Sequence, residues 1–223
     1  MKYKYDLHVH TKEVSPCGWL NATYVTDRYI ESGYAGIVLT DHFRSDFFEG
    51  CSEGQWEDRV KYYFQSYDKA KEHCKDKNFF IGLGMEIRFD NDPNDFLVYG
   101  LKKKDFINNR WMVHETIKSF YETYGDRCLI IQAHPNREFK CYLEDIKYLH
   151  GLEVYNSNPR HNNHNEETLK VAEENPYLIA TAGSDSHREE DLCRSGIETD
   201  VKIQSDEQLV AVLKSKAFHI LQD

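Results

Sequence analysis

The chain alternates short apolar runs with longer amphipathic stretches over its 223 residues. The apolar runs are rich in Val, Ile, Leu, Phe and Tyr and predict strands, whereas the amphipathic stretches predict helices. The predicted strands are 5–9, 36–40, 79–87, 96–101, 128–133, 151–155, 177–182 and 196–202. The predicted helices are 22–32, 55–74, 111–124, 143–148, 166–174 and 206–216. This alternation is typical of βα units, in which a helix makes the crossover that parallel strands require.

About seven or eight such units predict an α/β fold that closes into a TIM-like barrel, with an open doubly wound sheet as the alternative. The chain is 40% hydrophobic and 30% charged, and it contains no repeat and no recognisable linker. Its length fits one globular domain. We therefore predict a single domain over residues 1–223.

Composition narrows the classes of function. The formal net charge of -10 disfavours binding to nucleic acid or to a membrane surface, because both are anionic, so we expect a small substrate. The first residues do not form a signal peptide, and no run of about 18 apolar residues occurs. The six cysteines form no CxxC pair, which predicts reduced thiols and a cytoplasmic protein.

Polar residues gather where the predicted strands end. The carboxyl ends of parallel barrel strands share one rim, and active sites lie on that rim. The residues at or just beyond these ends are His8, His10, Asp41, His42, Glu86, His134, Asp185 and His187.

The spacing of these residues predicts a metal site. His8 and His10 are two residues apart, so on a strand their side chains project from the same face and can reach one cation, and Asp185 and His187 repeat that spacing. Crowded imidazoles and carboxylates are unfavourable unless a metal ion neutralises them. No role is assigned to the remaining histidines, which are His73, His114, His150, His161, His164 and His219.

The motifs DLHVHT, GIVLTDH, GMEIR, QAHP, LEVYNS and AGSDSH occur in this order between Asp6 and His187. In this respect the chain resembles the PHP (polymerase and histidinol phosphatase) domains. The resemblance implies a distorted, seven-stranded β/α barrel that holds two or three divalent ions, zinc, manganese or iron, and hydrolyses phosphate esters. It also implies a first metal on His8, His10, Glu86 and Asp185, a second on Glu86 and His134, and a third on His42 and His187.

Two positions depart from the family pattern. Cys17, in SPCG, stands where many members have a histidine for the third metal, so it is either a ligand that favours zinc or an idle thiol. Lys102 follows strand 96–101, where the family often has another histidine. Lys102 points away from the site, approaches the substrate phosphate or is modified. We prefer the first alternative, because LKKKD has the composition of a solvated run.

Other residues are assigned to catalysis and to the substrate. Asp41 or Asp185 can accept a proton from the attacking water, while Asp185 is also a ligand and Asp41 can instead orient His42. Arg137, Arg160 and Arg188 are candidates for binding the phosphate, because guanidinium groups bind it bidentately. The segment 43–56 either forms a lid or packs onto the barrel.

These expectations favour metal-dependent hydrolysis of a phosphate monoester on a small molecule, as in histidinol phosphatases. A phosphodiesterase, an amide hydrolase or a protein-tyrosine phosphatase uses the same kind of site. The departures at Cys17 and Lys102 leave a degenerate, non-catalytic metal-binding module as a further alternative.

Overall fold

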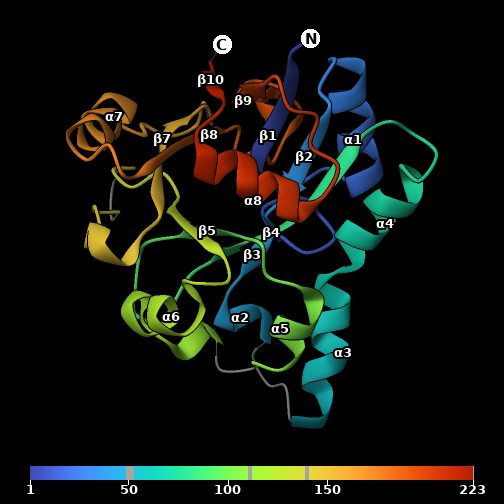
Figure 1. Ribbon diagram of the computed structural model, residues 1–223. Helices are drawn as coiled ribbons and strands as arrows, with labels where there is room; N and C mark the ends of the chain where they lie inside the picture. Colours follow the sequence, from blue (N-terminus) through green and yellow to red (C-terminus); the bar gives the residue numbers. More distant parts are fainter. Residues whose placement is uncertain (49–52, 110–111, 139–140, 223) are drawn as a thin grey trace.

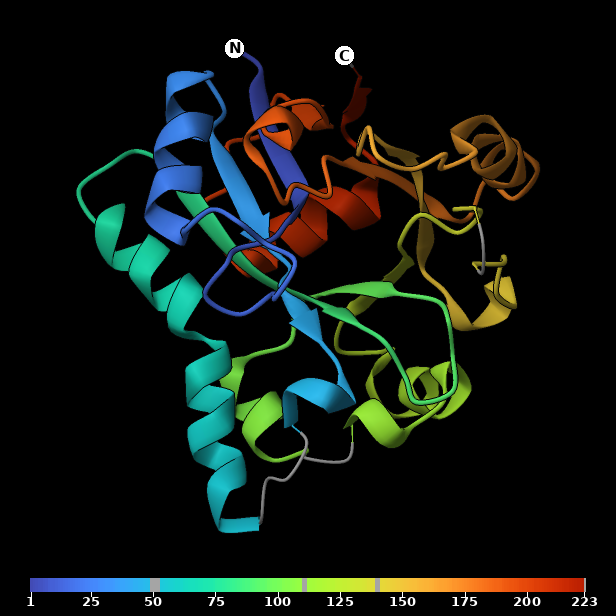
Figure 2. The same ribbon diagram turned by 180° about the vertical axis from the view of Figure 1, so that it is seen from behind.

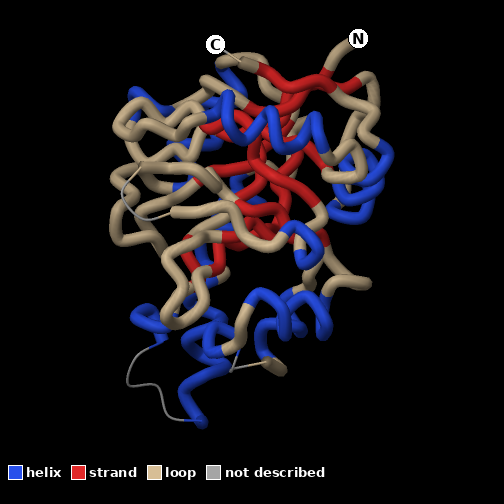
Figure 3. The backbone as a smooth tube through the Cα atoms, turned by 90° about the vertical axis from the view of Figure 1, so that its left-hand side faces the viewer, coloured by secondary structure: helices blue, strands red, loops and turns tan. Residues whose placement is uncertain are grey.

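In the computed structural model, which describes residues 1–48, 53–109, 112–138 and 141–222, one sheet forms a nearly closed barrel. The strands lie in the middle of the molecule and the helices lie outside them (Figures 1 and 3). Both ends of the chain lie at the same end of the molecule (Figure 1). The prediction of an α/β, distorted TIM-like barrel is confirmed.

Seven strands make up the wall that carries the site. They are β1 (Tyr3–Val9), β2 (Gly36–Leu39), β4 (Phe80–Ile87), β5 (Phe96–Tyr99), β6 (Leu129–Gln132), β7 (Gly151–Asn156) and β8 (Ile179–Gly183), and they are adjacent in this order. The short strand β3 (His42–Phe43) pairs with β4, while β9 (Gly196–Thr199) and β10 (His219–Leu221) extend the sheet beyond β1. The seven long strand predictions before residue 190 therefore match to within two residues at each end.

The barrel closes between β8 and β1 just beyond the end of β8. Val9 and Ser186 form a parallel bridge, and the His10 N–H donates to the Ser186 carbonyl at 3.1 Å. The amino end of β1, residues 3–5, pairs with β9 instead, so β8 and β1 meet only near the rim. This junction brings the motifs DLHVHT and AGSDSH together.

Strand β5 departs from the predicted parallel arrangement. It runs antiparallel to both β4 and β6, because residues 88–95 form a short return that contains no helical crossover. The amino end of β5 therefore reaches the rim where its neighbours have their carboxyl ends. Asp95 enters the rim from there, and Lys102 is carried to the opposite end of the barrel.

Helices surround this wall. They are α1 (Ala22–Glu31), α2 (Ser45–Phe48), α3 (Glu53–Tyr63), α4 (Gln65–His73), α5 (Lys103–Ile107), α6 (Ile117–Tyr124), α7 (Asn165–Glu174) and α8 (Asp206–Ser215), with 3₁₀ turns η1 (Met112–His114), η2 (Ile146–Tyr148) and η3 (Glu189–Asp191). From behind, α3 and α4 run down one side of the molecule (Figure 2). The amphipathic pattern predicted most of these elements, because each buries one apolar face against the barrel.

Three helix predictions need correction. The predicted helix 55–74 is two helices, α3 and α4, that meet at Phe64, a buried residue whose backbone (φ -80°, ψ 0°) interrupts the regular turn. The prediction 143–148 is only the turn η2. In the prediction 111–124, residue 111 lies outside the described residues, and regular helix begins only after Thr116, whose hydroxyl caps the Ser119 N–H at 3.2 Å.

Aromatic side chains hold the described part of segment 43–56 against the barrel. Its described residues Phe43, Phe48 and Trp56 are all buried, and the Phe43 ring lies 4.6 Å from that of Phe48. The Trp56 indole N–H donates to the Phe106 carbonyl at 3.2 Å. Of the two alternatives, these residues follow the second, packing onto the barrel, while 49–52 lie outside the described residues.

Two expectations from composition can be compared with the described residues. None of the described helices is long and apolar enough to cross a lipid bilayer. The described cysteines form no disulfide: Cys17, Cys74, Cys128, Cys141 and Cys193 are free thiols.

Candidate metal centre

The strand β1 delivers two imidazoles to the rim. His8 and His10 are both buried, and their Nε2 atoms face each other at 3.0 Å. Alternation along the strand places both side chains on the inner face, as predicted from their spacing. Two basic nitrogens this close need a shared proton or a shared cation between them.

Glu153 of β7 sets the orientation of His8. Its Oε1 lies 2.9 Å from His8 Nδ1, so the carboxylate accepts the Nδ1 proton and leaves Nε2 as a free base. Its Oε2 accepts hydrogen bonds from the His134 N–H at 3.0 Å and from Asn156 Nδ2 at 2.9 Å. Sequence reasoning missed Glu153, although a lone acidic residue inside the apolar run GLEVYN is the signal that could have revealed it.

Ser15 sets the orientation of His10 in a similar way. Its hydroxyl donates to Asp41 Oδ1 at 2.8 Å and accepts from the His42 N–H at 3.0 Å. A hydroxyl has one proton and two lone pairs, so its contact with His10 Nδ1 at 3.1 Å must be one in which the imidazole donates. His10 Nε2 is thereby left free to bind a cation.

Asp41 lies behind the ligands. Its buried carboxylate accepts four hydrogen bonds of 2.7–2.8 Å, from the Thr11 N–H and hydroxyl and from the hydroxyls of Ser15 and Ser66. Burial raises its pKa, and these hydrogen bonds oppose the rise. The arrangement matches the alternative in which Asp41 positions its neighbours, and it does so through Ser15, which contacts both His10 and His42.

Glu86, at the end of β4, is the centre of the cluster. Its Oε1 lies 3.3 Å from His8 Nε2 and 3.1 Å from His134 Nε2, and its Oε2 lies 3.5 Å from His10 Nε2. Oε2 also contacts His42 Nδ1, so one carboxylate faces four imidazoles, which come from β1, β3 and the end of β6. This position between two sets of histidines is what a bridging ligand requires.

Asp185 divides its two oxygens between the histidines and an arginine. Oδ1 lies 3.5 Å from His8 Nε2 and 3.4 Å from His10 Nε2, while Oδ2 is paired with Arg137. Asp185 (φ 50°) and His134 (φ 32°) both have left-handed backbones. Strain of this kind gathers at functional sites, where the surrounding structure holds it in place.

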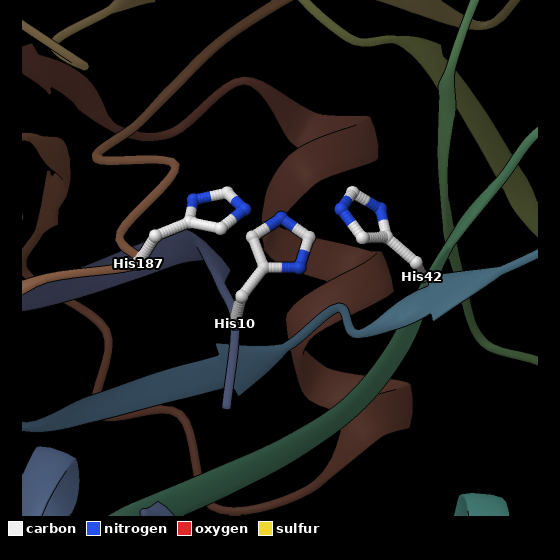
Figure 4. Close-up of side chains that lie close together, drawn as sticks. All are labelled: His10, His42 and His187. Atoms are coloured by element: carbon white, nitrogen blue, oxygen red, sulfur yellow. The ribbon is translucent and has the colours of Figure 1, made fainter. Parts of the chain in front are cut away.

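A third cluster forms at the mouth of the site. The imidazole of His10 lies between those of His42 and His187, with ring centroids 4.4 and 4.3 Å away (Figure 4). Cys17 Sγ lies 3.1 Å from His42 Nε2. Burial raises the pKa of the Cys17 thiol, but hydrogen bonds with His187 and His42 bring it down to about 6. The thiol predicted to replace a family histidine is therefore beside the imidazoles.

In the metal-free centre, the electrostatics favour the charged carboxylates of Glu86 and Asp185, a neutral His10 and a protonated His8. Burial raises the pKa of Glu86 and of Asp185, yet the adjacent imidazoles and, for Asp185, Arg137 bring both pKa values well below their usual range. Burial and two neighbouring imidazoles hold the pKa of His10 well below its ordinary value. Burial also lowers the pKa of His8, but three carboxylates outweigh it and raise that pKa.

The donor atoms meet the requirements of divalent metal ions. Among the described residues, three groups have ligand atoms within 4.8 Å of one another: His8, His10 and Asp185; His8, Glu86 and His134; His10, His42 and His187. His42 Nδ1 and Glu86 Oε2 are buried in contact with each other, and neither atom makes a further hydrogen bond to a described residue. Buried imidazole and carboxylate atoms that converge in this way suit zinc, manganese or iron.

A cavity of about 350 Å³ opens onto these groups. Its lining includes the three predicted arginines, each with a partner: Arg137 with Asp185, Arg160 with the buried Asp191, and Arg188 with the ring of Trp19 at 4.2 Å. Two further arginines, Arg44 and Arg88, line the same cavity and were missed by sequence reasoning. His161 also lines it, although no role was assigned to it.

Lys102 lies away from the centre, as preferred from the sequence. Its ammonium pairs with Glu207 at 3.2 Å in a separate cavity next to α8, and its side chain is 64% exposed. The antiparallel direction of β5 explains this placement, because residues after Tyr99 emerge at the opposite end of the barrel.

Comparison with known proteins gives a likeness in structure only. No protein-family model and no curated protein matches the chain. A two-domain protein from Bacteroides vulgatus ATCC 8482, described as containing a predicted PHP-like metal-dependent phosphoesterase, shares 17% identity at a TM-score of 0.72. The alignment covers 100% of this chain and 65%, less than two thirds, of that protein.

Two further solved structures are similar. A putative metal-dependent phosphoesterase from Bifidobacterium adolescentis ATCC 15703 has 16% identity and a TM-score of 0.51 over 83% of this chain and 88% of its own. An amidohydrolase from Chromobacterium violaceum, with bound sulfate and no metal, has 14% identity and a TM-score of 0.54 over 98% of both chains. The chain thus has the fold of PHP-like metal-dependent phosphoesterases, as its motifs predicted.

Proposed function

We propose that this protein is a metal-dependent hydrolase that cleaves the phosphate monoester of a small molecule. The observation that carries the proposal is the convergence of three ligand groups on one cavity that five arginines line. The ligand groups provide for divalent ions, and the arginines provide for a doubly charged phosphate.

We assign the ligands as the resemblance to PHP domains implies, and each assigned set overlaps one of the three groups. His8, His10, Glu86 and Asp185 would hold a first ion, and Glu86 would share a second with His134. The cluster of His42 and His187, with Cys17 as an additional ligand, would hold a third. Bound divalent ions supply charge that stabilises the phosphoryl group during its transfer and acidifies water.

The residues of the chain itself have separate tasks in this proposal. Arg137 holds Asp185 in place and, with Arg160 and Arg188, binds the phosphoryl oxygens. Asp185 is the nearer candidate for accepting a proton from the attacking water, because its Oδ1 is directed at the cluster whereas all the hydrogen bonds of Asp41 are internal. Asp41 then serves as a positioning residue. We further propose a small phosphorylated substrate and a cytoplasmic location.

The metal content of purified protein tests this proposal. We expect two or three equivalents of zinc, manganese or iron by mass spectrometry in the wild type. His10→Ala should lose most of them, because His10 belongs to two of the three groups. Cys17→Ala should lose one equivalent if its thiol is a ligand, and His219→Ala, at an exposed position on β10, is the matched control.

Turnover of matched substrates tests the reaction itself. Metal-loaded protein should release phosphate from monoesters of small molecules faster than it cleaves diesters or amides or dephosphorylates phosphotyrosine peptides. Absence of bound metal after incubation with zinc or manganese would contradict the proposed hydrolase and leave a barrel with some other task. Preference for a diester or an amide panel would keep the metal centre but replace the substrate class.

A further inference from the structure

The five arginines of the cavity come from two sectors of the barrel rim. Arg137, Arg160 and Arg188 follow β6, β7 and β8 along the chain. Arg44 follows β3 and Arg88 follows β4, and both strands belong to the sector next to β5. The proposed reaction assigns the phosphoryl oxygens to the first set, which raises the question of what the second set binds.

The two sets differ in how their charge is balanced. In the first set, Arg137 and Arg160 each have a carboxylate of their own, in Asp185 and Asp191, and Arg188 lies on the ring of Trp19 and 3.9 Å from Glu190. In the second set, two guanidinium groups share one carboxylate. Apart from Glu86, whose Oε2 lies 3.9 Å from Arg44 Nη2, the two positive charges of the Arg44–Arg88 pair have only Asp95 as a carboxylate partner among the described residues.

Asp95 holds this pair at the rim. Arg88 binds it through both arms of its guanidinium, with Nε at 2.8 Å from Oδ1, and Arg44 Nη2 lies 3.2 Å from the same oxygen. The Asp95 side chain is only 3% exposed, so cations in the solvent do not reach its carboxylate. It enters the cavity because β5 begins at this rim, which fixes the two arginines beside each other.

Arg44 has donor capacity left over. Its Nε–H is buried and has no hydrogen-bond partner among the residues that the structure describes. Its Nη2 lies 3.9 Å from Glu86 Oε2, but Glu86 also faces four imidazoles and is assigned to the metal ions. A buried donor and an excess charge are both unfavourable without an acceptor, and an anion satisfies both.

We propose that Arg44 and Arg88 form a second anion subsite, which binds a carboxylate or second phosphate carried by the same small molecule whose phosphate lies at the metal ions. This inference rests on the proposed function and narrows its substrate class to doubly anionic phosphate esters. A cavity of about 350 Å³ is large enough for a small metabolite with two anionic groups, whereas one phosphate would leave much of it empty. Guanidinium forks suit both oxyanions because they donate in pairs.

Binding of phosphonates to the metal-loaded protein tests the subsite without turnover, because the carbon–phosphorus bond is not an ester. Propylphosphonate carries one anionic group, 3-phosphonopropionate adds a carboxylate, and propane-1,3-bisphosphonate adds a second phosphonate. We expect titration calorimetry to give a dissociation constant about tenfold lower for at least one doubly anionic probe than for propylphosphonate. The two doubly anionic probes show which oxyanion the subsite prefers.

Substitutions connect that preference to the arginines. The quantity to compare is the dissociation constant of propylphosphonate divided by that of the tighter-binding doubly anionic probe. This ratio should fall toward one in Arg88→Met and, separately, in Arg44→Met, whereas Arg88→Lys should keep part of it. Arg28→Met, on α1 and outside the cavity, is the matched control and should keep the full ratio. Thermal unfolding of each variant identifies any that does not fold, in which case the other substitution decides.

Two results would overturn the subsite: equal affinity of the wild type for all three probes, or a ratio unchanged in both methionine variants. The latter would mean that the arginines do not distinguish a second charge. The proposed function fails differently, through absence of ester hydrolysis by metal-loaded protein. A preserved ratio without turnover would retain the anion subsite and reject the phosphatase.

Discussion

Glu153 Oε1 lies 2.9 Å from His8 Nδ1, deep in the barrel, and both side chains are fully buried. The contact fixes which nitrogen of His8 faces the metal groups and makes that nitrogen more basic. In Glu153→Gln we therefore expect metal affinity to fall by about 10–100-fold. Competition with a chromophoric chelator measures the affinity.

The control for this substitution is Glu173→Gln, an exposed position on α7, which should bind metal as the wild type does. Glu153→Asp retains the charge but shortens the side chain, so partial recovery relative to the glutamine variant separates charge from packing. Unchanged metal affinity in a folded Glu153→Gln protein would contradict the positioning role.

Asp41→Asn should destabilise the fold by about 2 kcal/mol. The amide replaces an acceptor oxygen by a donor in a place where four donors already converge, which leaves buried groups unsatisfied. Urea unfolding of the metal-free protein measures the loss, with Asp46→Asn at an exposed position as control. If Asp41→Asn keeps its stability and metal content but loses turnover, Asp41 is the proton acceptor that the sequence offered as an alternative.

The sequence predicted the fold and most of the candidate ligand residues that the structure brings together, because both depend on short, periodic patterns. Strand alternation placed His8 and His10 on one face, and the parallel rim gathered His42, Glu86 and Asp185. The direction of β5 was not predicted, since the apolar run Phe96–Tyr99 has the same composition in either direction. That direction alone decides that Asp95, rather than Lys102, reaches the site.

Residues that act through others were also missed. Glu153 and Ser15 have no motif of their own, and their roles depend on contacts between segments far apart in sequence, such as the 145 residues between His8 and Glu153. Arg44 and Arg88 were passed over because a surface arginine and a cavity arginine look alike in sequence. Only the tertiary contact with Asp95 distinguishes them.

Cys17 should react with iodoacetamide at an unusually low pH in the metal-free protein. Only the thiolate reacts, and with a pKa of about 6 the rate should rise with pH and reach half its maximum near that value. Cys128 is the internal control, because burial raises its pKa to about 12 and it should stay unmodified at neutral pH. Peptide mass spectrometry follows both sites.

Added zinc should slow the alkylation of Cys17 if the thiol is a ligand. A half-maximal rate near the pH of an ordinary thiol, about 8.5, would show that His42 and His187 do not stabilise the thiolate. Alkylation that is fast with or without zinc would instead favour the idle thiol.

Phe43→Ala should cost about 3–5 kcal/mol of unfolding free energy. The ring is fully buried, and its centroid lies 5.1 Å from that of Tyr63 and 5.5 Å from that of Phe106. Removing it therefore leaves a cavity in the core and loses these contacts. Because it directly follows His42, the loss should also weaken the third ligand group. Tyr177→Ala, at a side chain that is 62% exposed, should change stability by no more than about 0.5 kcal/mol.

His150 should make the stability of the fold depend on pH, away from the metal centre. Its Nδ1 accepts a hydrogen bond from the Ile130 N–H at 3.1 Å, and burial lowers its pKa below the ordinary 6.5. The unfolded chain therefore takes up a proton more readily than the folded one, so this contribution to stability is present above pH 6.5 and is lost as the pH falls below it.

His150→Asn keeps an acceptor near the Nδ1 position but cannot be protonated. Urea unfolding at pH 7 and pH 5 should thus show a smaller decrease in His150→Asn than in the wild type, whereas His219→Asn, at an exposed position, should match the wild type. Equal decreases in all three proteins would mean that His150 titrates alike in the folded and unfolded chains.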